Sequence, residues 1–278
     1  MKFSIITINY NNRDGLRKTI ESVLFQSFSD YEYIIIDGGS IDGSVDIIKD
    51  YSDKIDYWIS EPDNGIYHAM NKGILQSHGE YLIFMNSGDD FFNREVLKGV
   101  IPFLDRDIIV GKVMHDVEIW GFQKEDITML DLIQGTIMHQ ASFIHRKLFD
   151  LNMYDEKYTI VSDWKFYIQS LIFDNATFRN INLIICRLTP GGVSEIDVVK
   201  RNMERNEIYK ELFPERILKD YFKLSKADSP LLELTPQLNE TYRLNKLAYH
   251  IVDILIRVND LFLHIKRIIK TKFIKTID

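Results

Sequence analysis

Short apolar segments alternate with amphipathic ones along the first ninety residues of the chain. Four runs rich in β-branched and aromatic residues are predicted to be strands, at 3–8, 31–37, 56–60 and 81–85. Between these runs the apolar residues are spaced three to four apart, which predicts a helix after each of the first three strands. Strands that alternate with helices are typical of a parallel sheet, whose strands are buried on both faces and therefore read as continuous apolar runs.

The pattern is less regular after residue 90. Further strands are predicted at 107–113, 117–122, 137–145 and 177–186. A helix is predicted at 163–173, and from residue 196 onward the apolar spacing is helical. We interpret 91–195 as the second half of the same domain. The chain shows no internal repeat.

Residues 242–278 form a separate amphipathic segment. Apolar side chains recur in it at alternating spacings of four and three, at Leu244, Ala248, Ile251, Leu255, Val258, Phe262, Ile265 and Ile269. The segment holds eight Lys and Arg against three Asp, a net charge of +5, so the other residues carry −12 of the total of −7. Three interpretations stay open: a helix that forms a dimer, a helix packed on the rest of the chain, or a basic helix lying on an anionic membrane surface.

The composition is that of an ordinary globular protein. The chain has 278 residues, of which 45% are hydrophobic and 27% are charged. A net charge of −7 argues against a general nucleic-acid binder, which would show a basic excess. The lone Cys186 excludes an intramolecular disulfide and is typical of a reducing compartment. With no run of about 18 apolar residues and no signal-like segment, we expect a cytoplasmic location.

Polar residues directly follow each of the first four predicted strands. They form the clusters 9–12, 37–40, 60–65 and 86–90. Ligands of parallel α/β sheets bind outside the carboxyl ends of the strands. We therefore expect these four clusters to converge on one binding site.

Asp89 and Asp90 are candidate metal ligands at this edge. They follow the strand 81–85 and lie next to Gly88, which permits a close approach of the backbone. Hard divalent cations such as Mg²⁺ and Mn²⁺ take oxygen ligands, often one or two carboxylates together with substrate phosphates. Residues 86–90 are equally typical of a β-turn that binds nothing, and the pattern alone does not decide between the two.

The turn Asp37-Gly38-Gly39-Ser40 puts a carboxylate after the second strand, where an acidic residue accepts hydrogen bonds from a ribose or a base. A helix N-cap formed by Ser40 or Asp42 is the alternative. The first strand is followed neither by the GxGxxG fingerprint of dinucleotide-binding folds nor by a GxxxxGK[ST] phosphate loop. The sequence therefore argues against these two nucleotide-binding classes.

Three stretches of the chain carry a family resemblance: SIITINYNNRDGLRKTIESVLFQSFSDYEYIIIDGGSIDGS, SEPDNGIYHAMNKGI and GEYLIFMNSGDD. In this order they resemble the family 2 glycosyltransferases of the GT-A fold, especially bacterial enzymes of polysaccharide biosynthesis, over about residues 1–190. The resemblance implies an α/β fold with a Rossmann-like, mainly parallel central sheet flanked by helices, followed here by a C-terminal helical extension.

On this basis we predict a GT-A domain at 1–240 and a basic amphipathic helix at 241–278. Within the domain, 1–90 is expected to be the nucleotide-binding half and 91–195 the acceptor-facing half, and 196–240 to be helical.

The resemblance also implies a set of side chains that contact the nucleotide: Thr7, Asn9, Tyr10, Asp37, Ser40, Asp63, Asn71 and Lys72. It implies that Asp89 binds Mg²⁺ or Mn²⁺, with Asp90 as a second candidate ligand. The family's DxDD motif reads Asn86-Ser87-Gly88-Asp89 here, so its first and third carboxylates are replaced.

Asp163 resembles the catalytic base of the family, because it lies in the stretch IVSDW, which fits a late [ED]D-like motif at the start of a helix. An inverting transfer needs one base within about 3 Å of the acceptor hydroxyl. The alternative is that Ser162 or Asp163 only caps the helix.

Four further residues are candidates for contacts to the donor or acceptor sugar: Asn86, His139, Gln140 and Trp164. The pair His139-Gln140 in IMHQASF resembles a recurrent feature of this subgroup, near the point where donor sugar and acceptor meet. A purely structural role is equally open for the histidine. Aromatic residues such as Trp164 more often belong to the core.

Together these features imply a metal-dependent, inverting glycosyltransferase of the hexosyltransferase type. Its partners would be a nucleotide-sugar donor, most simply UDP-linked, and a saccharide or polyprenyl-diphosphate-linked acceptor. A lipid-linked acceptor would explain a basic segment at 242–278 and a peripheral position at the inner face of the cell membrane; homodimerisation through this segment is the other interpretation.

Two alternatives remain at the level of sequence. The first is a non-catalytic nucleotide-sugar-binding component of a polysaccharide assembly complex. The second is a nucleotidyltransferase, which would need a Gly-rich phosphate loop with an Arg or Lys that residues 9–15 do not provide.

Overall fold

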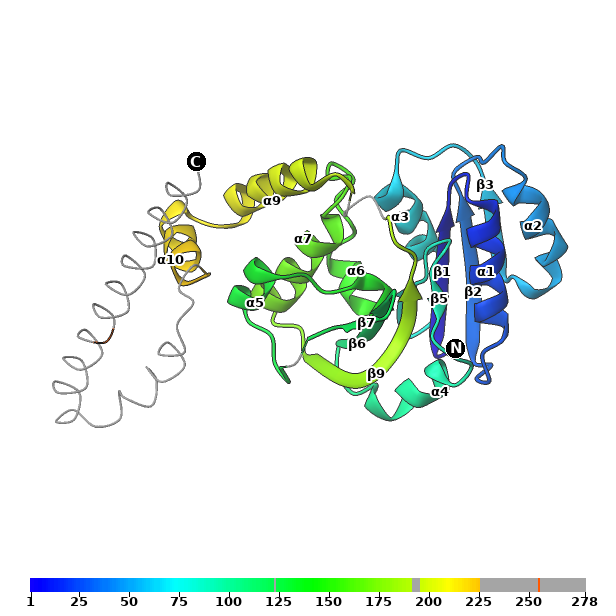
Figure 1. Cartoon of the computed structure of the whole chain (residues 1–278), viewed down its shortest axis with the longest axis horizontal. Coiled ribbons are helices and arrows are strands. Elements are labelled where there is room, and N and C mark those ends of the chain that lie inside the picture. Colours follow the sequence, from blue (N-terminus) through cyan, green and yellow to red (C-terminus); the bar gives the residue numbers. More distant parts are fainter. Residues whose placement is uncertain (123, 192–195, 226–254, 256–278) are drawn as a thin grey trace, which may run out of the picture. The chain divides into compact units, whose positions relative to one another are not determined.

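Four parallel strands form the first half of the sheet in the computed structural model, which describes residues 1–122, 124–191, 196–225 and 255 (Figure 1). The strands are β1 (Phe3–Asn9), β2 (Tyr31–Asp37), β3 (Tyr57–Ser60) and β4 (Tyr81–Phe84). β1 lies between β2 and β4, and β3 pairs with the other side of β2. Every residue of β1 is buried, as expected of a strand covered on both faces. The parallel strands predicted from the sequence are confirmed.

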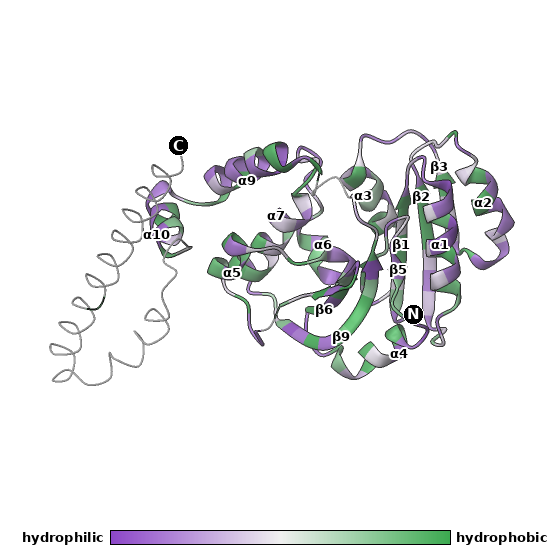
Figure 2. Ribbon diagram, viewed as in Figure 1, coloured by the Kyte–Doolittle hydropathy of each residue, from purple (hydrophilic) through white to green (hydrophobic). Residues whose placement is uncertain are grey.

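Three helices connect these strands: α1 (Arg13–Leu24), α2 (Ser44–Asp50) and α3 (Ile66–Gln76). Because side chains alternate along a strand, Ile5 and Ile6 of β1 belong to different hydrophobic cores. Ile5 shares its core with Leu16 of α1 and Ile47 of α2, while Ile6 shares its core with Met70 of α3. Figure 2 shows the central strands as largely hydrophobic. The central strands of the sheet thus separate two cores.

The second half of the sheet is mixed. Its strands are β5 (Asp90–Phe91), β6 (Ile108–His115), β7 (Glu118–Trp120), β8 (Ser142–His145) and β9 (Phe178–Leu188). β8 pairs antiparallel with both β4 and β6, and β6 is parallel to β9. β5 pairs antiparallel with β9, and β7 pairs antiparallel with β6. The described residues therefore form a nine-stranded sheet in the order β3-β2-β1-β4-β8-β6-β9-β5, with β7 beside β6.

Several short elements, most of them in the second half, differ from the sequence prediction. The helices α4 (Val96–Val100), α5 (Met129–Gln134) and α6 (Lys147–Leu151) and the 3₁₀ turns η1 (Ser52–Lys54) and η2 (Ile101–Phe103) were not predicted. The strand predicted at 137–145 begins only at Ser142, because His139–Ala141 forms the 3₁₀ turn η3. The helix predicted at 163–173 is α7 (Ser162–Ile168), which continues as the π-helical turn η4 (Gln169–Phe173).

Within the described residues 196–225, where the helical pattern begins, the structure has the helices α9 (Val198–Leu212) and α10 (Glu215–Ser225). Figure 2 shows α9 as mostly hydrophilic, and its buried residues are Glu204, Ile208 and Tyr209. Within the described part of the chain, no helix combines the length and the apolarity that a membrane crossing requires. The segment 241–278 lies outside the described residues except for residue 255, so its predicted helix stays a prediction.

Candidate active site

The carboxyl ends of β1, β2 and β3 meet at one edge of the sheet. Their last residues are paired in register, Asn9 opposite Asp37 and Asp37 opposite Ser60. Asp37 accepts hydrogen bonds from Asn9 Nδ2 at 2.7 Å, Ser60 Oγ at 2.6 Å, and Ser40 Oγ and N at 2.6 and 2.9 Å. The predicted convergence of the strand ends is therefore present in the structure for these residues.

The carboxylate of Asp37 organises this edge and is not open to a ligand. The residue is fully buried, and each of its oxygens already accepts two hydrogen bonds, which fills both acceptor sites of each. Burial on its own raises the pKa of Asp37, but the hydrogen bonds from Ser40, Ser60 and Asn9 outweigh it and hold the pKa below its usual value. Ser40 Oγ also accepts from the backbone N–H of Asn11 at 2.8 Å. Asn9, Asp37 and Ser40 thus shape the loops around the edge.

The side chains of Tyr10 and Asp63 both lie next to Gly38, which follows Asp37 in the chain. The Tyr10 side chain is exposed, with 67% of its residue surface accessible. A Cβ atom on Gly38 would lie 2.6 Å from Asp63 Oδ2 and 3.2 Å from Tyr10 Cδ2, so only glycine allows this approach. An exposed aromatic ring beside a carboxylate is suited to hold a flat, hydrogen-bonding group. Tyr10 is exposed and Asp63 partly exposed, so both are accessible members of the predicted nucleotide set.

Three other members of that set have structural partners. Thr7 is fully buried, and its hydroxyl donates to the carbonyl of Met85 at 2.8 Å. Asn71 is buried and exchanges hydrogen bonds with the backbone of Tyr154. Lys72 forms an ion pair of 2.7 Å with Glu61 at the loop after β3. The structure does not bring Thr7 and Asn71 to the surface formed by Tyr10 and Asp63.

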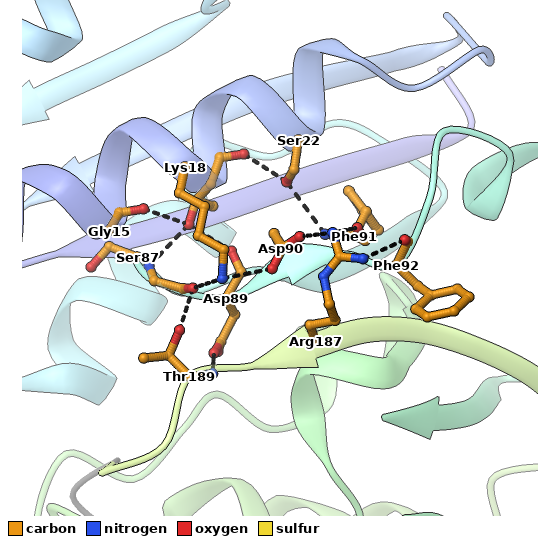
Figure 3. Close-up of polar contacts among 12 residues, drawn as sticks. Gly15, Lys18, Ser22, Ser87, Asp89, Asp90, Phe91, Phe92, Arg187 and Thr189 are labelled. Carbon is orange, nitrogen blue, oxygen red and sulfur yellow. Dashed lines mark hydrogen bonds and ion pairs between the residues drawn. The ribbon is translucent and has the colours of Figure 1, made fainter. Parts of the chain in front are cut away.

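Asp89 and Asp90 point to different sides of the chain, as Figure 3 shows. Asp90 forms an ion pair of 2.7 Å with Lys18 and a second ion pair with Arg187. Asp89 instead accepts hydrogen bonds from Thr189 N at 2.9 Å and from Gln140 Nε2 at 3.2 Å. Adjacent residues of an extended chain face opposite ways, which explains the separation. The structure therefore does not join the two carboxylates into one metal site, and Asp90 has two cationic partners of its own.

Gly88, which stands at the third position of the motif, has a backbone conformation that disfavours a side chain. Gly88 has φ = +106°, in the region that side chains rarely adopt. A Cβ atom there would also lie 3.3 Å from Asn12 Nδ2 and 3.4 Å from Thr189 Oγ1. The backbone of Gly88 accepts from Lys18 Nζ at 3.0 Å and donates to Thr19 Oγ1 at 3.0 Å. The turn that presents Asp89 is therefore built around a glycine.

The side-chain oxygens of Asp89 and Asn86 suit a hard divalent cation that is also bound by the phosphates of a ligand. Burial raises the pKa of Asp89 above its usual value, although hydrogen bonds from Thr189 and Gln140 lower it in part. Asn86 Oδ1, three residues earlier, is buried and lacks a hydrogen-bond partner among the described residues. No group of three His, Cys, Asp or Glu residues in the described chain could hold a metal by itself. Oxygen donors with few protein carboxylates match a cation that is also held by phosphates.

Asp163 lies at the centre of a second polar network. Its Oδ2 lies 3.0 Å from His139 Nδ1, and its Oδ1 accepts from Tyr67 Oη at 2.8 Å and from Trp164 N at 2.9 Å. The other ring nitrogen of His139, Nε2, lies 3.0 Å from Asn86 Nδ2. Burial raises the pKa of Asp163, but the hydrogen bonds from His139 and Tyr67 outweigh it and the pKa is lowered. Asp163 is thus held as a carboxylate.

The two networks are adjacent. His139 and Gln140 are consecutive residues of η3, and the first reaches Asp163 while the second reaches Asp89. The structure therefore brings together five of the predicted residues, which come from segments far apart in sequence: Asn86, Asp89, His139, Gln140 and Asp163.

Trp164 belongs to the core and not to this site. The residue is fully buried, and its indole N–H donates to the carbonyl of Leu132 at 2.8 Å. The guanidinium of Arg205 covers its ring, 4.9 Å from the centroid. A sugar has no access to this ring in the structure, so we leave Trp164 out of the proposed contacts.

Sequence reasoning missed Tyr67 and Glu204. Tyr67 lies within the stretch SEPDNGIYHAMNKGI and reads as an apolar helix position, and nothing local distinguishes it from a core residue. Glu204 lies in a charge-rich helix, where a carboxylate is normally exposed. Only the folded chain shows that each contacts Asp163 or the loop before it.

Glu204 of α9 holds the loop that precedes Asp163. Its carboxylate accepts from Thr159 N and Oγ1 at 2.9 and 2.8 Å, from Ile160 N at 2.9 Å and from Val161 N at 3.3 Å. We expect Glu204→Ala to lower the free energy of unfolding by about 2–4 kcal/mol, because buried N–H groups lose their acceptor. Urea denaturation measures this change.

The matched control is Glu207→Ala on the same helix. Glu207 is exposed and makes one ion pair of 3.7 Å with Lys157, so its removal is expected to change the free energy of unfolding by about 0.5 kcal/mol or less. Equal effects of the two substitutions would contradict the role assigned to Glu204.

Comparison with known proteins defines the class of this fold and site. The family model Glycosyl transferase family 2 matches residues 4–172. The glycosyltransferase Rv1514c of Mycobacterium tuberculosis is 33% identical over 207 residues, which is 68% of this chain and 76% of that protein. The chain belongs to glycosyl transferase family 2, a family of enzymes that transfer sugars.

Solved structures share the fold. TarS 1–349 of S. aureus, in complex with UDP-GlcNAc, has a TM-score of 0.59 and 21% identity over 69% of this chain and 59% of that one. The mannosyltransferase PcManGT of Pyrobaculum calidifontis, in complex with GDP-Man and Mn²⁺, has a TM-score of 0.57 and 13% identity over 76% of this chain and 63% of that one. This chain therefore spans about three fifths of both structures. The likeness confirms the predicted GT-A type of α/β fold.

Proposed function

We propose that this chain is an inverting glycosyltransferase that moves a sugar from a UDP-linked nucleotide sugar to a hydroxyl of a saccharide or polyprenyl-diphosphate-linked acceptor. The observation that carries the proposal is the position of His139 between Asp163 and Asn86. Beside it, Gln140 donates a hydrogen bond to Asp89. A candidate base and a candidate cation ligand are therefore connected through two consecutive residues.

Asp163 is the proposed base. Its lowered pKa keeps it ionised near neutral pH, so that it can accept the proton of the acceptor hydroxyl. In the same step the acceptor oxygen bonds to the anomeric carbon, and the bond from that carbon to the diphosphate oxygen breaks. The electron pair of that bond leaves with the nucleoside diphosphate. One carboxylate suffices for this displacement, which inverts the anomeric centre.

Tyr10 and Asp63 are the proposed contacts to the nucleoside. The exposed ring of Tyr10 offers a face on which a base can stack, and Asp63 Oδ2 beside Gly38 can accept a hydrogen bond from a base or a ribose. The hydrogen bonds of Asn9, Asp37 and Ser40 stabilise the strand ends next to these two residues. The complex of TarS with UDP-GlcNAc favours uridine as the nucleoside.

Asp89 is the proposed protein ligand of Mg²⁺ or Mn²⁺. When bound there, the cation supplies positive charge that stabilises the diphosphate as it leaves. The presence of Mn²⁺ in the complex of PcManGT supports this assignment. Asn86, His139 and Gln140 are the proposed contacts to the transferred sugar or the acceptor, since they lie between Asp89 and Asp163.

We further propose a cytoplasmic enzyme that reaches lipid-linked acceptors at the inner face of the membrane. The support is the charge of +5 on residues 242–278 beside −12 on the others, which sum to −7. Basic amphipathic segments bind anionic lipid surfaces. Homodimerisation through this segment is the competing proposal, since its four-three spacing is also that of helix pairing.

A thermal-shift panel of nucleotide sugars tests donor binding. With Mn²⁺ and a UDP-sugar at about 100 times its Kd, binding is expected to stabilise the protein by about 2.7 kcal/mol, which raises Tm by several degrees. GDP-sugars at the same concentration and UDP-sugars with excess EDTA serve as controls and should shift Tm less. No shift with any nucleotide sugar would contradict the proposal.

Release of UDP from a UDP-sugar in the absence of acceptor separates an enzyme from a non-catalytic binder. A binder raises Tm without consuming the donor, whereas a transferase lets water replace the acceptor slowly. The two readouts together distinguish failure of binding from failure of catalysis.

A further inference from the structure

The hydroxyl of Tyr67 lies between two hydrogen-bond acceptors. Tyr67 Oη is 2.8 Å from the carbonyl oxygen of Ile160 and 2.8 Å from Asp163 Oδ1. A phenol has one hydrogen to donate, so it satisfies only one of these acceptors fully at any moment. Burial and the nearby Asp163 raise the pKa of Tyr67 well above its usual value, so the hydroxyl keeps its hydrogen at working pH.

The two oxygens of Asp163 are unequally occupied. A carboxylate oxygen has about two sites for hydrogen-bond donors. Oδ1 is occupied by Tyr67 Oη and Trp164 N, whereas Oδ2 has one contact among the described residues, with His139 Nδ1. The open site on the carboxylate is therefore on Oδ2.

From this geometry we propose that Tyr67 is a positioning residue for the base: it keeps Asp163 ionised and turned so that the open site of Oδ2 receives the proton of the acceptor. This inference rests on the proposed function and deepens it. His139 also favours the ionised form of Asp163. Its Nδ1–H donates a hydrogen bond to Oδ2, and its Nε2 accepts one from Asn86 Nδ2.

The shared hydrogen of Tyr67 lets the hydroxyl keep a hydrogen-bond acceptor in both protonation states of Asp163. While Asp163 is ionised, the hydroxyl donates to Oδ1. Once the acceptor's proton is on Oδ2, Oδ1 is a weaker acceptor and the same hydrogen turns to the carbonyl of Ile160, which is equally near. A buried hydroxyl whose hydrogen had no acceptor would otherwise destabilise the protonated state. Tyr67 thus serves both protonation states of the base.

The other titratable groups around Asp163 come from each element packed against it. They are His139 of η3, Tyr154 in the loop before α7, Tyr167 of α7 and Arg205 of α9. Burial raises the pKa of both Tyr154 and Tyr167, so these two stay neutral. Arg205 stays charged and, with His139, favours the ionised form of Asp163. Tyr67 is therefore one of four groups that favour the carboxylate, with His139, Arg205 and the backbone N–H of Trp164. Removing it should shift the pKa of Asp163 without abolishing ionisation at neutral pH.

The test compares Tyr67→Phe with Tyr154→Phe. The two rings pack together with centroids 5.4 Å apart, and Tyr154 Oη has no hydrogen-bond partner in the described part of the chain. Removing a donor to the ionised form raises the pKa of Asp163, so the acid limb of kcat/KM in Tyr67→Phe should move up by about one pH unit. Above this limb, KM for the nucleotide sugar should be unchanged. Tyr154→Phe should keep the wild-type profile.

An acid limb that stays in place in Tyr67→Phe, or that moves equally in Tyr154→Phe, overturns the inference. A second measurement does not depend on transfer: titration of the ¹³Cγ signal of Asp163, identified by its loss in Asp163→Asn. The wild-type carboxyl should titrate below about 3.9, the ordinary value for aspartate. A wild-type value at or above it overturns the inference even if Tyr67→Phe does not fold. If the wild-type protein transfers no sugar, the proposed function fails, while the same titration in Tyr67→Phe, where the pKa of Asp163 should rise, still decides the role of Tyr67.

Discussion

Asp163→Asn is expected to lower the rate of sugar transfer by about 100-fold or more while the affinity for the nucleotide sugar stays the same. The amide has nearly the shape of the carboxylate but cannot accept the proton of the acceptor hydroxyl at neutral pH. Because Asp163 is held by Tyr67, Trp164 and His139 and not by the residues proposed to bind the nucleotide, donor binding should survive. Steady-state kinetics and calorimetric titration of the donor measure the two quantities.

The control for this substitution is Asp155→Asn. Asp155 is also a carboxylate with a lowered pKa near α7, but its partner is Lys165, whose Nζ lies 2.6 Å away. The control should keep transfer and lose some stability. Transfer retained in Asp163→Asn would remove this residue from the mechanism, and a loss in both variants would point to a structural effect.

Asp89→Asn is expected to abolish the gain in nucleotide-sugar affinity that Mn²⁺ provides, and with it most of the transfer activity. An amide oxygen is a weaker ligand of a hard cation than a carboxylate, and the described residues offer no cluster of carboxylates to replace it. The measurement is the dissociation constant of the UDP-sugar with and without Mn²⁺, for which we expect a wild-type ratio of at least about tenfold and a ratio near one in the variant.

The neighbouring Asp90→Asn is the matched comparison. Asp90 is buried between Lys18 and Arg187, both of which are about half exposed. Its substitution should therefore lower the free energy of unfolding by about 1–3 kcal/mol and leave the Mn²⁺ dependence intact. If Asp90→Asn instead removes the effect of Mn²⁺ and Asp89→Asn does not, the assignment of the ligand is reversed.

The first half of the sheet could be predicted from the sequence because its information is local. β1, β2 and β4 are continuous apolar runs, and each ends where polar residues begin. Parallel strands joined by helices place their carboxyl ends on one edge, so the meeting of Asn9, Asp37 and Ser60 follows from the order of elements.

The candidate site was only partly predictable. Motif resemblance selected Asp163, His139 and Asp89, but it could not show that consecutive residues of η3 connect them. Residue type alone did not reveal that Thr7 and Trp164 point into the two cores, because a hydroxyl and an indole suit a ligand as well as a buried hydrogen bond. Which face a side chain occupies depends on strand register and helix rotation.

Local pattern by itself determined the βαβ order, the polar strand ends and the glycine turn at Gly88, since these depend on residues close together in the chain. Only the tertiary structure decided which carboxylate has a lowered pKa, which has a raised pKa and which is bound in ion pairs. All four carboxylates belong to aspartates, but their surroundings differ. Asp37 accepts four hydrogen bonds, and burial raises the pKa of Asp89. Asp90 forms two ion pairs, and Asp163 accepts a hydrogen bond from the shared hydroxyl of Tyr67. The charge and reactivity of a buried carboxylate depend on the donors around it, and those donors come from distant parts of the chain.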